Sequence, residues 1–295
     1  MSALPSISIV TPSLNQAAFL DETIQSVLSQ KYPRLEYVVI DGGSTDGSVE
    51  IIKNSSQHLH YWVSEEDDGH GHALNKGFAH TSGEILAWIN SDDKYMPWTF
   101  EVVGEIFTLF PHVNWIVGFN AWWSSKGFLT SAVRNPKNVY DMLLGNYRWI
   151  QQESVFWRRS LWEKAGGRIN QDFNFMVDGD LWCRFFLLDE LYSVDCILSG
   201  YRVHSTNRAK DHYAQCLAEM ERTIATMKSK CPQNVLQTYS TLKAVNRIKK
   251  VPLLNYLPVA TLGRQLLPAT FAKAAYKNLF FEDGLWKERH LPFSL

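Results

Sequence analysis

Several features that define special protein classes are absent from this sequence. No run of about 18 apolar residues occurs, so no membrane-spanning helix is expected. The first residues, Met-Ser-Ala-Leu-Pro, lack the basic start and apolar core of a secretory signal peptide. The formal net charge is only -1 over 295 residues, which gives no general attraction to nucleic acid. These absences predict a cytoplasmic globular protein that binds no nucleic acid.

Cysteine and metal-binding patterns are also sparse. The four cysteines are far apart and form no Cys-x-x-Cys pair, which favours free thiols over disulfides or a zinc site. The sequence His70-Gly-His72 supplies too few ligands for zinc, so we interpret it as a loop. A dehydrogenase would need Gly-x-Gly-x-x-Gly after the first strand, but Thr-Pro-Ser-Leu-Asn stands there instead.

Charge is distributed unevenly along the chain. Residues 242–295 hold nine Lys/Arg and three Asp/Glu, a net of +6, so the remaining residues carry -7. This basic segment mixes cations with apolar residues between prolines. Such a composition could lie on an anionic membrane surface, or it could form helices that pack on the rest of the protein. Both interpretations stay open at this stage.

Strand-like and helical segments alternate over the first 95 residues. This alternation predicts a parallel sheet with helical crossovers, whose polar loops gather at the carboxyl edge, where such folds bind ligands. The expected strands are 7–10, 36–40, 60–64 and 84–89, and the expected helices are 19–30, 46–52 and about 73–82. Further on we expect helices at 99–110, 161–165, 181–188 and 208–230, strands at 115–119, 128–133, 154–157 and 197–203, and more helices beyond Pro232.

The fourth strand ends in the most informative stretch of the chain. The apolar run Ile85–Ile89 is followed directly by Asn90, Ser91, Asp92 and Asp93. Two adjacent carboxylates at the end of a buried strand are costly unless a cation accompanies them. A divalent metal ion that holds a diphosphate would explain both the acids and their position.

Four motifs in this order resemble those of family 2 glycosyltransferases of the GT-A fold. They are Thr-Pro-Ser-Leu-Asn at 11–15, Asp-Gly-Gly-Ser-Thr-Asp-Gly-Ser at 41–48, Asn-Lys-Gly at 75–77 and Asn-Ser-Asp-Asp at 90–93. The resemblance covers roughly the first 205 residues. It implies an α/β, Rossmann-like, mostly parallel central sheet flanked by helices, with a C-terminal helical extension. The expected catalytic domain is 1–230, with a nucleotide-sugar half at 1–95 and an acceptor half at 96–230, followed by a basic helical segment at 231–295.

The resemblance also implies which residues bind the nucleotide-sugar donor. Asp41 would contact the base, although a turn-forming Asp before two glycines needs no ligand. Asp46 is expected to cap a helix instead of touching a ligand. The implied donor-binding residues are Thr11, Pro12, Ser13, Asp41, Asp68, Asn75, Lys76, Asn90 and Ser91.

Two further residues are implied to hold a divalent cation, Mn²⁺ or Mg²⁺. Asp92 would bind the metal that bridges the two phosphates, and His204, at the end of a strand, would lie near it. Many family members have Asp where this chain has Asn90, which brings no charge. Capping of the next turn is the structural alternative for Asp92 and Asp93.

Inversion at the anomeric carbon needs a base for the acceptor hydroxyl. In Met-Val-Asp-Gly-Asp-Leu-Trp at 176–182 the resemblance identifies Asp178 as that base, although Val177 stands where many members have Glu. Helix capping is the alternative for Asp178. Gln152 and Trp157 lie in a segment like the family's acceptor side, and the tryptophans at 122, 123, 149 and 157 could stack on sugars or pack in the core.

The sequence therefore predicts an inverting, metal-dependent glycosyltransferase that uses a nucleotide-diphospho-sugar donor. The acceptor would be a hydroxyl of a glycan or lipid-linked glycan in cell-surface polysaccharide synthesis. The expected location is cytoplasmic, with peripheral contact at the inner face of the membrane through the basic C-terminal segment. The alternative is a non-catalytic module that binds a nucleotide-sugar or a glycan.

Overall fold

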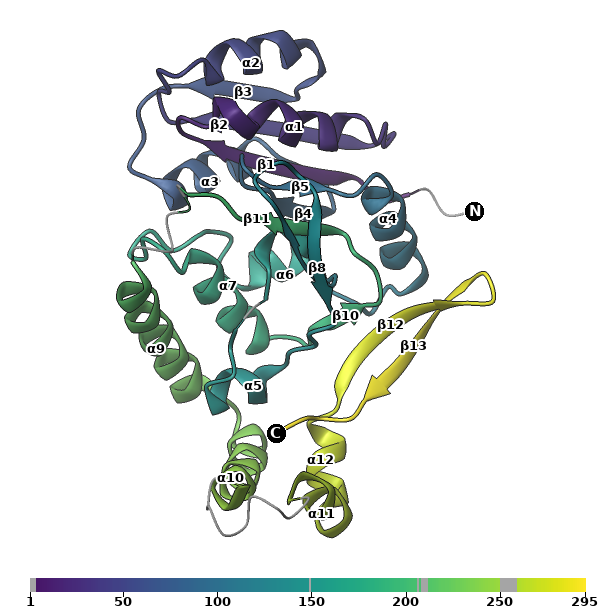
Figure 1. The fold of residues 1–295 in the computed structure, drawn as a ribbon. Coiled ribbons are helices and arrows are strands. Elements are labelled where there is room, and N and C mark those ends of the chain that lie inside the picture. The colour runs from purple at the N-terminus through teal and green to yellow at the C-terminus, as the bar shows by residue number, and fades with distance from the viewer. Residues whose placement is uncertain (1–3, 149, 206, 208–211, 250–258) are drawn as a thin grey trace.

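A central sheet organises the computed structural model, which describes residues 4–148, 150–205, 207, 212–249 and 259–295 (Figure 1). Within these residues the sheet has nine strands, flanked by helices. The order across it is β13 (Leu285–Leu291), β12 (Tyr276–Glu282), β10 (Tyr192–Val194), β6 (Trp115–Val117), β9 (Val155–Arg158), β4 (Ile85–Trp88), β1 (Ile7–Ser13), β2 (Leu35–Asp41) and β3 (Tyr61–Ser64).

The first four strands pair in parallel, as the alternating pattern predicted. β1 lies between β2 and β4, and β2 also pairs with β3. The apolar runs of β1, β2 and β4 are buried because helices cover such sheets, whereas the edge strand β3 is half-buried. β9 is antiparallel to both β4 and β6, whereas β6, β10 and β12 continue in parallel. The expected mostly parallel α/β sheet is confirmed.

A smaller sheet begins where the loop after β4 ends. Within the described residues it contains β5 (Lys94–Tyr95), β11 (Ser199–Arg202), β7 (Asn120–Trp123) and β8 (Leu129–Val133), in that order. β11 pairs antiparallel with β5 and parallel with β7. This pairing carries the segment around residue 202 to the point where the main chain leaves β4.

Helices fill the connections between the strands. The helix predicted at 208–230 is α9 (Tyr213–Lys230), and residues 208–211 of the predicted segment lie outside the described part of the chain. The helices are α1 (Ala17–Leu28), α2 (Ser48–Ser55), α3 (His70–Ala79), α4 (Thr99–Leu109), α5 (Val139–Leu144), α6 (Arg159–Lys164), α7 (Val177–Phe186), α9 (Tyr213–Lys230), α10 (Gln233–Lys249), α11 (Val259–Leu266) and α12 (Pro268–Lys273), with 3-10 turns η1 (Ser56–His58) and η2 (Gln152–Ser154). None of those described combines the length and apolarity that a membrane span requires.

The expectation of helices alone beyond Pro232 is wrong. α10, α11 and α12 are present, but β12 and β13 form a hairpin whose first strand pairs with β10. Asp283 and Gly284 at its tip have φ values of 54° and 78°, the left-handed backbone that a tight hairpin turn requires. Figure 1 shows the hairpin beside α4, which Trp286 reaches through a hydrogen bond of 2.9 Å to Glu105. The domain boundary at residue 230 stays a prediction.

A cluster of tryptophans forms the centre of the core. Trp157 lies 5.5 Å from Trp88 and 5.8 Å from Trp182 between ring centroids, and it is fully buried. The prediction that Trp157 contacts the acceptor is therefore wrong, because a ring packed on all sides cannot stack on a sugar. Trp123 is buried as well, and Trp149 lies outside the described residues.

Candidate active site

The carboxyl ends of the parallel strands bring several predicted residues to one edge. Ser13 at the end of β1 is in register with Asp41 at the end of β2. Val10 of β1 pairs with Trp88 of β4, so residues 90–93 leave the sheet at the same edge. Thr23 of α1 fixes this loop, because its hydroxyl contacts the carbonyl oxygens of Ser91 at 3.0 Å and Asp93 at 2.7 Å.

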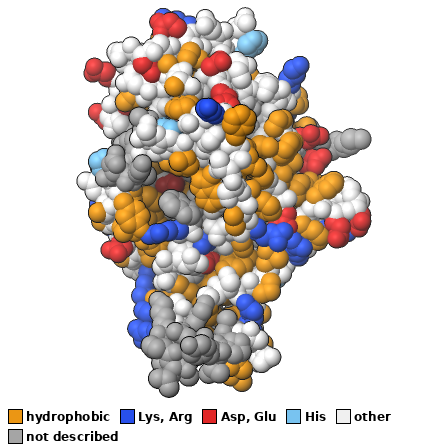
Figure 2. All heavy atoms as spheres, viewed as in Figure 1, with side chains coloured by type: hydrophobic (Ala, Val, Ile, Leu, Met, Phe, Trp, Pro, Cys, Tyr) orange, Lys and Arg blue, Asp and Glu red, His pale blue; other side chains and the backbone are white. Residues whose placement is uncertain are grey.

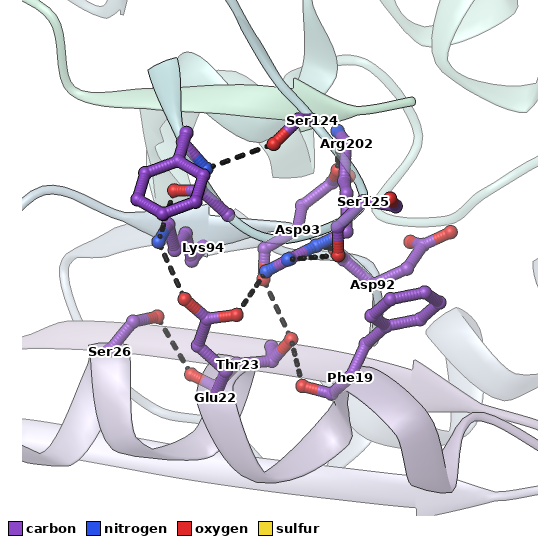
Figure 3. A network of polar contacts seen from close by, with 12 residues as sticks. Phe19, Glu22, Thr23, Ser26, Asp92, Asp93, Lys94, Ser124, Ser125 and Arg202 are labelled. Atoms are coloured by element: carbon purple, nitrogen blue, oxygen red, sulfur yellow. Dashed lines mark hydrogen bonds and ion pairs between the residues drawn. The ribbon is translucent and has the colours of Figure 1, made fainter. Parts of the chain in front are cut away.

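A buried arginine holds the two acids after β4 in place (Figure 3). Arg202 on β11 is only 1% exposed, and its guanidinium donates to Glu22 Oε2 of α1 at 2.6 Å and to the carbonyl oxygen of Asp92 at 2.5 Å. Its backbone N–H donates to Asp93 Oδ1 at 2.8 Å. The guanidinium also lies over the ring of Phe19, at 5.1 Å. Arg202 thus has an internal structural role, and the other oxygen of Glu22 receives Lys94.

Asp92 and His204 form a close pair beside this network. His204 Nε2 lies 2.9 Å from Asp92 Oδ2, and the imidazole packs on Phe19 with 4.7 Å between ring centroids. Asn207 accepts the backbone N–H of His204 at 2.7 Å, which orients the residue. The described residues contain no group of three or more His, Cys, Asp or Glu that could hold a metal. This pair would supply two ligands, as Mg²⁺-type sites that also use substrate phosphates require.

A cavity of about 640 Å³ opens beside this pair, and the predicted base lies in its wall. Asp178 is the second residue of α7, and its Oδ1 accepts the N–H of Gly179 at 2.8 Å. Burial raises the pKa of Asp178 to about 6, although the hydrogen bond from Gly179 opposes this effect. Asn90, Gln152 and His204 line the same cavity, so four predicted site residues meet there.

Glu153 is a residue of the cavity that the sequence did not single out. Its side chain is buried, and its Oε1 has no hydrogen-bond partner among the described residues. Burial, together with the nearby charges of Asp178 and Asp92, holds the pKa of Glu153 well above its usual range. The sequence signal for Glu153 was its position directly after Gln152 in the predicted acceptor segment. Its burial depends on the η2 turn, which the sequence did not predict.

The donor-side residues have mostly structural contacts. Thr11 is fully buried and its hydroxyl lies 3.0 Å from the Tyr37 hydroxyl, and its place in the lining of the nucleotide pocket stays a prediction. Asp41 is also fully buried, and its oxygens receive the Ser44 N–H at 2.9 Å and hydroxyl at 2.6 Å and the Ser64 hydroxyl at 2.7 Å. These contacts match the turn-forming alternative, and a base would reach Asp41 only if this loop moved.

The predicted donor residues in the loop and helix after β3 also have contacts within the protein or lie exposed. Both amide atoms of Asn75 are engaged by the backbone of Ile169, at 2.9 and 2.8 Å, which ties α3 to a later loop. Lys76 pairs with Glu65 at 2.7 Å on the surface. The side chain of Asp68 is 95% exposed. Donor contacts of Asp68, Asn75 and Lys76 stay predictions, and the amide of Asn75 has a structural role besides.

Asp46 links the starts of two helices. Its Oδ2 accepts the backbone N–H of Ala17, the first residue of α1, at 2.9 Å. Its Oδ1 accepts the backbone N–H of Ser48, the first residue of α2, at 3.1 Å. The N-cap residue of α2 is Gly47, so Asp46 binds the first N–H of each helix without being the capping residue that the sequence predicted.

Comparison with known proteins places this geometry in a family. The model of the family "Glycosyl transferase family 2" matches residues 8–113. An uncharacterized glycosyltransferase of Mycobacterium tuberculosis is 31% identical over 205 residues, which cover 68% of this chain and 76% of the relative. The chain belongs to glycosyltransferase family 2. A second relative, the putative teichuronic acid biosynthesis glycosyltransferase TuaG of Bacillus subtilis, is 34% identical over 94 residues, or 31% of this chain and 37% of TuaG.

Solved structures extend the comparison of this family 2 glycosyltransferase to its fold. S. aureus TarS residues 1–349 in complex with UDP superimposes with a TM-score of 0.63 and 15% identity, covering 96% of both chains. The mannosyltransferase PcManGT of Pyrobaculum calidifontis, in complex with GDP-Man and Mn²⁺, gives a TM-score of 0.54 and 19% identity, covering 92% of this chain and 87% of PcManGT. The GT-A fold expected from the sequence is confirmed.

The Arg202 network predicts unequal costs for removing the two cations that hold Glu22. Arg202→Met should lower the free energy of unfolding by roughly 3 kcal/mol, because it removes one of the two cations on Glu22 and leaves the Asp92 carbonyl oxygen without its donor. Lys94→Met should cost under about 1 kcal/mol, because the Lys94 side chain is 20% exposed whereas that of Arg202 is 1% exposed. Urea denaturation of both variants measures the difference, and equal losses would contradict the role assigned to Arg202.

Proposed function

We propose that this glycosyltransferase inverts the anomeric centre and transfers a sugar from a nucleotide-diphosphate donor to a hydroxyl group of its acceptor. One observation supports this proposal above the others. Asp178 lies in the wall of the same cavity that His204 lines, and His204 contacts Asp92. A base for the acceptor and a site for the leaving diphosphate therefore border one space at the carboxyl edge of the sheet.

The proposed reaction is a single displacement. The acceptor oxygen attacks the anomeric carbon and forms the new glycosidic bond, while its proton passes to the carboxylate of Asp178. The bond between the anomeric carbon and the phosphate oxygen breaks, and its electron pair leaves with the nucleoside diphosphate. Because burial raises the pKa of Asp178 to about 6, the carboxylate is ionised at neutral pH yet is more basic than an exposed Asp.

Asp92 and His204 are the residues that would hold a divalent cation. One carboxylate oxygen and one imidazole nitrogen, 2.9 Å apart, leave room in the coordination sphere for phosphate oxygens and water. A bound Mn²⁺ or Mg²⁺ would stabilise the negative charge of the diphosphate. Arg202 keeps Asp92 in position through its carbonyl oxygen, which leaves the Asp92 carboxylate directed at His204.

The donor and acceptor classes are proposed with support from the relatives. TarS has been solved with UDP-GlcNAc and PcManGT with GDP-Man and Mn²⁺, so both bind nucleotide-sugars. TuaG is named for teichuronic acid biosynthesis. The proposal is therefore a glycan or lipid-linked acceptor in cell-surface polysaccharide synthesis. Peripheral membrane contact of the basic C-terminal segment remains part of it.

Asp178→Asn should abolish most of the sugar transfer. The amide keeps the shape of the side chain but cannot take a proton, so kcat should fall by about 10²–10⁴-fold. A radiolabelled or coupled assay with a panel of nucleotide-sugars measures the loss. Asp172→Asn, an exposed acid just before α7, is the control and should leave activity unchanged. Full activity of Asp178→Asn would remove the base assignment.

The pH dependence should follow the ionisation of Asp178. The pKa of this carboxyl is about 6, so it is protonated at lower pH and unable to act as a base. The value of kcat/KM should be constant above about pH 7 and fall about tenfold per pH unit below about pH 6. A profile that stays flat down to about pH 5 would contradict this prediction.

Metal and nucleotide should stabilise the protein together. A thermal-shift series with UDP or GDP should show a higher Tm when Mn²⁺ is added, because ligands that bind only the folded state stabilise it by mass action. Asp92→Asn should lose the Mn²⁺-dependent part, and Asp21→Asn, an exposed acid of α1, should retain it. No shift with any nucleoside diphosphate would favour the alternative of a glycan-binding module.

A further inference from the structure

A second cavity lies where the end of α9 meets α10. Its volume is about 420 Å³, and it shares no lining residue with the cavity beside Asp178. Lys228 of α9 and one side of α10, from Leu236 to Arg247, line it. The cavity is therefore separate from the space to which the proposed reaction is assigned.

The lining of this second cavity is basic. Three of its seven residues are cations, Lys228, Lys243 and Arg247, and none is an acid. Two of them lie over the same ring, because the Nζ atoms of Lys228 and Lys243 are 5.1 and 5.5 Å from the ring centroid of Tyr239. None of the ion pairs found among the described residues involves any of the three cations. Like charges that converge on one space repel one another unless an anion lies between them.

The surrounding sequence supplies no acid to balance these cations. Between Glu221 and Glu282 the chain contains no Asp or Glu, so the second half of α9 and all of α10 carry only basic charges. Figure 2 shows Lys and Arg side chains in a column at the lower left, where Figure 1 has the end of α9 and the start of α10. The helix dipole favours Lys228 and Lys230 in the last turn of α9, but it does not account for Lys243 in the middle of α10. A ligand is left to balance the charge of the cavity.

A phosphate group matches this lining better than a carboxylate does. A phosphomonoester carries about two negative charges at neutral pH, on three acceptor oxygens that point in different directions. A carboxylate has one charge and two oxygens in one plane. Arginine binds phosphate through parallel N–H donors, and lysine binds it as a point charge. The cavity is larger than a phosphate group, which leaves room for the part of the ligand that carries the phosphate.

We infer that Lys228, Lys243 and Arg247 form a binding site for the phosphate group of a phosphomonoester, which is either a soluble molecule or a lipid headgroup. A ligand held there joins the end of α9 to α10 and takes no part in the sugar transfer. The inference differs from a general attraction of the basic segment to anions, because particular positions on two helices carry the binding.

Calorimetry with inorganic phosphate, on the full chain and without divalent metal, tests the site. Lys228→Gln and Lys243→Gln should each weaken binding by at least about tenfold, because each removes one of three charge-assisted contacts. Lys230→Gln is the matched control. It removes the same charge from the same turn of α9, but Lys230 does not line the cavity, so binding should change by less than about twofold.

Cosedimentation with phosphatidylcholine vesicles that contain phosphatidic acid separates the two sources of the phosphate. Vesicle binding that Lys228→Gln loses and Lys230→Gln keeps would identify a lipid headgroup. The same dependence with inorganic phosphate, but not with vesicles, would identify a soluble phosphomonoester. Equal losses in Lys228→Gln and Lys230→Gln with both probes, or no binding of either probe, would overturn the site. The proposed reaction is tested separately, because Asp178 lines the other cavity.

Discussion

The ion pair between Arg202 and Glu22 is the interaction on which the site depends. A guanidinium that is almost fully buried is tolerated only because its donors are paired, and here the partners come from α1, from the loop after β4 and from the loop after β7. The two residues are 180 positions apart in the sequence. One contact therefore joins α1 to β11, and the hydrogen bond from the same guanidinium to the Asp92 carbonyl oxygen sets the position of that backbone.

Around this fixed point the acids are placed in very different surroundings. Asp92 faces His204, whereas Asp178 lies at the start of α7 in the cavity wall. The charges of both residues act on the buried carboxyl group of Glu153. Burial is the main cause of the raised pKa values of Glu153 and Asp178, and at Glu153 the charges of Asp178 and Asp92 add to its effect. A site that contains these three acids should favour a cation and ligands that donate hydrogen bonds.

Much of the fold could be predicted from the sequence, and less of the site. Runs such as Ile85–Ile89 indicate buried strands by composition alone, and acids that follow a strand must emerge at the sheet edge. The hairpin at 276–291 was not predicted, although Asp283-Gly284 is a good turn signal, because the C-terminal segment was interpreted as helices separated by prolines. The burial of Trp157 and Glu153 could not be predicted, since which face of a strand or turn is enclosed depends on residues distant in the sequence.

The hairpin also has a consequence for how the chain reaches its final state during translation. β10 pairs with β6 on one side and β12 on the other, but β12 is synthesised long after β10. At ribosomal speeds of about 5–20 residues per second, one edge of β10 stays unpaired for several seconds. Nascent molecules therefore pass through a period with an open sheet edge, in which chaperones that bind extended segments would find a natural target.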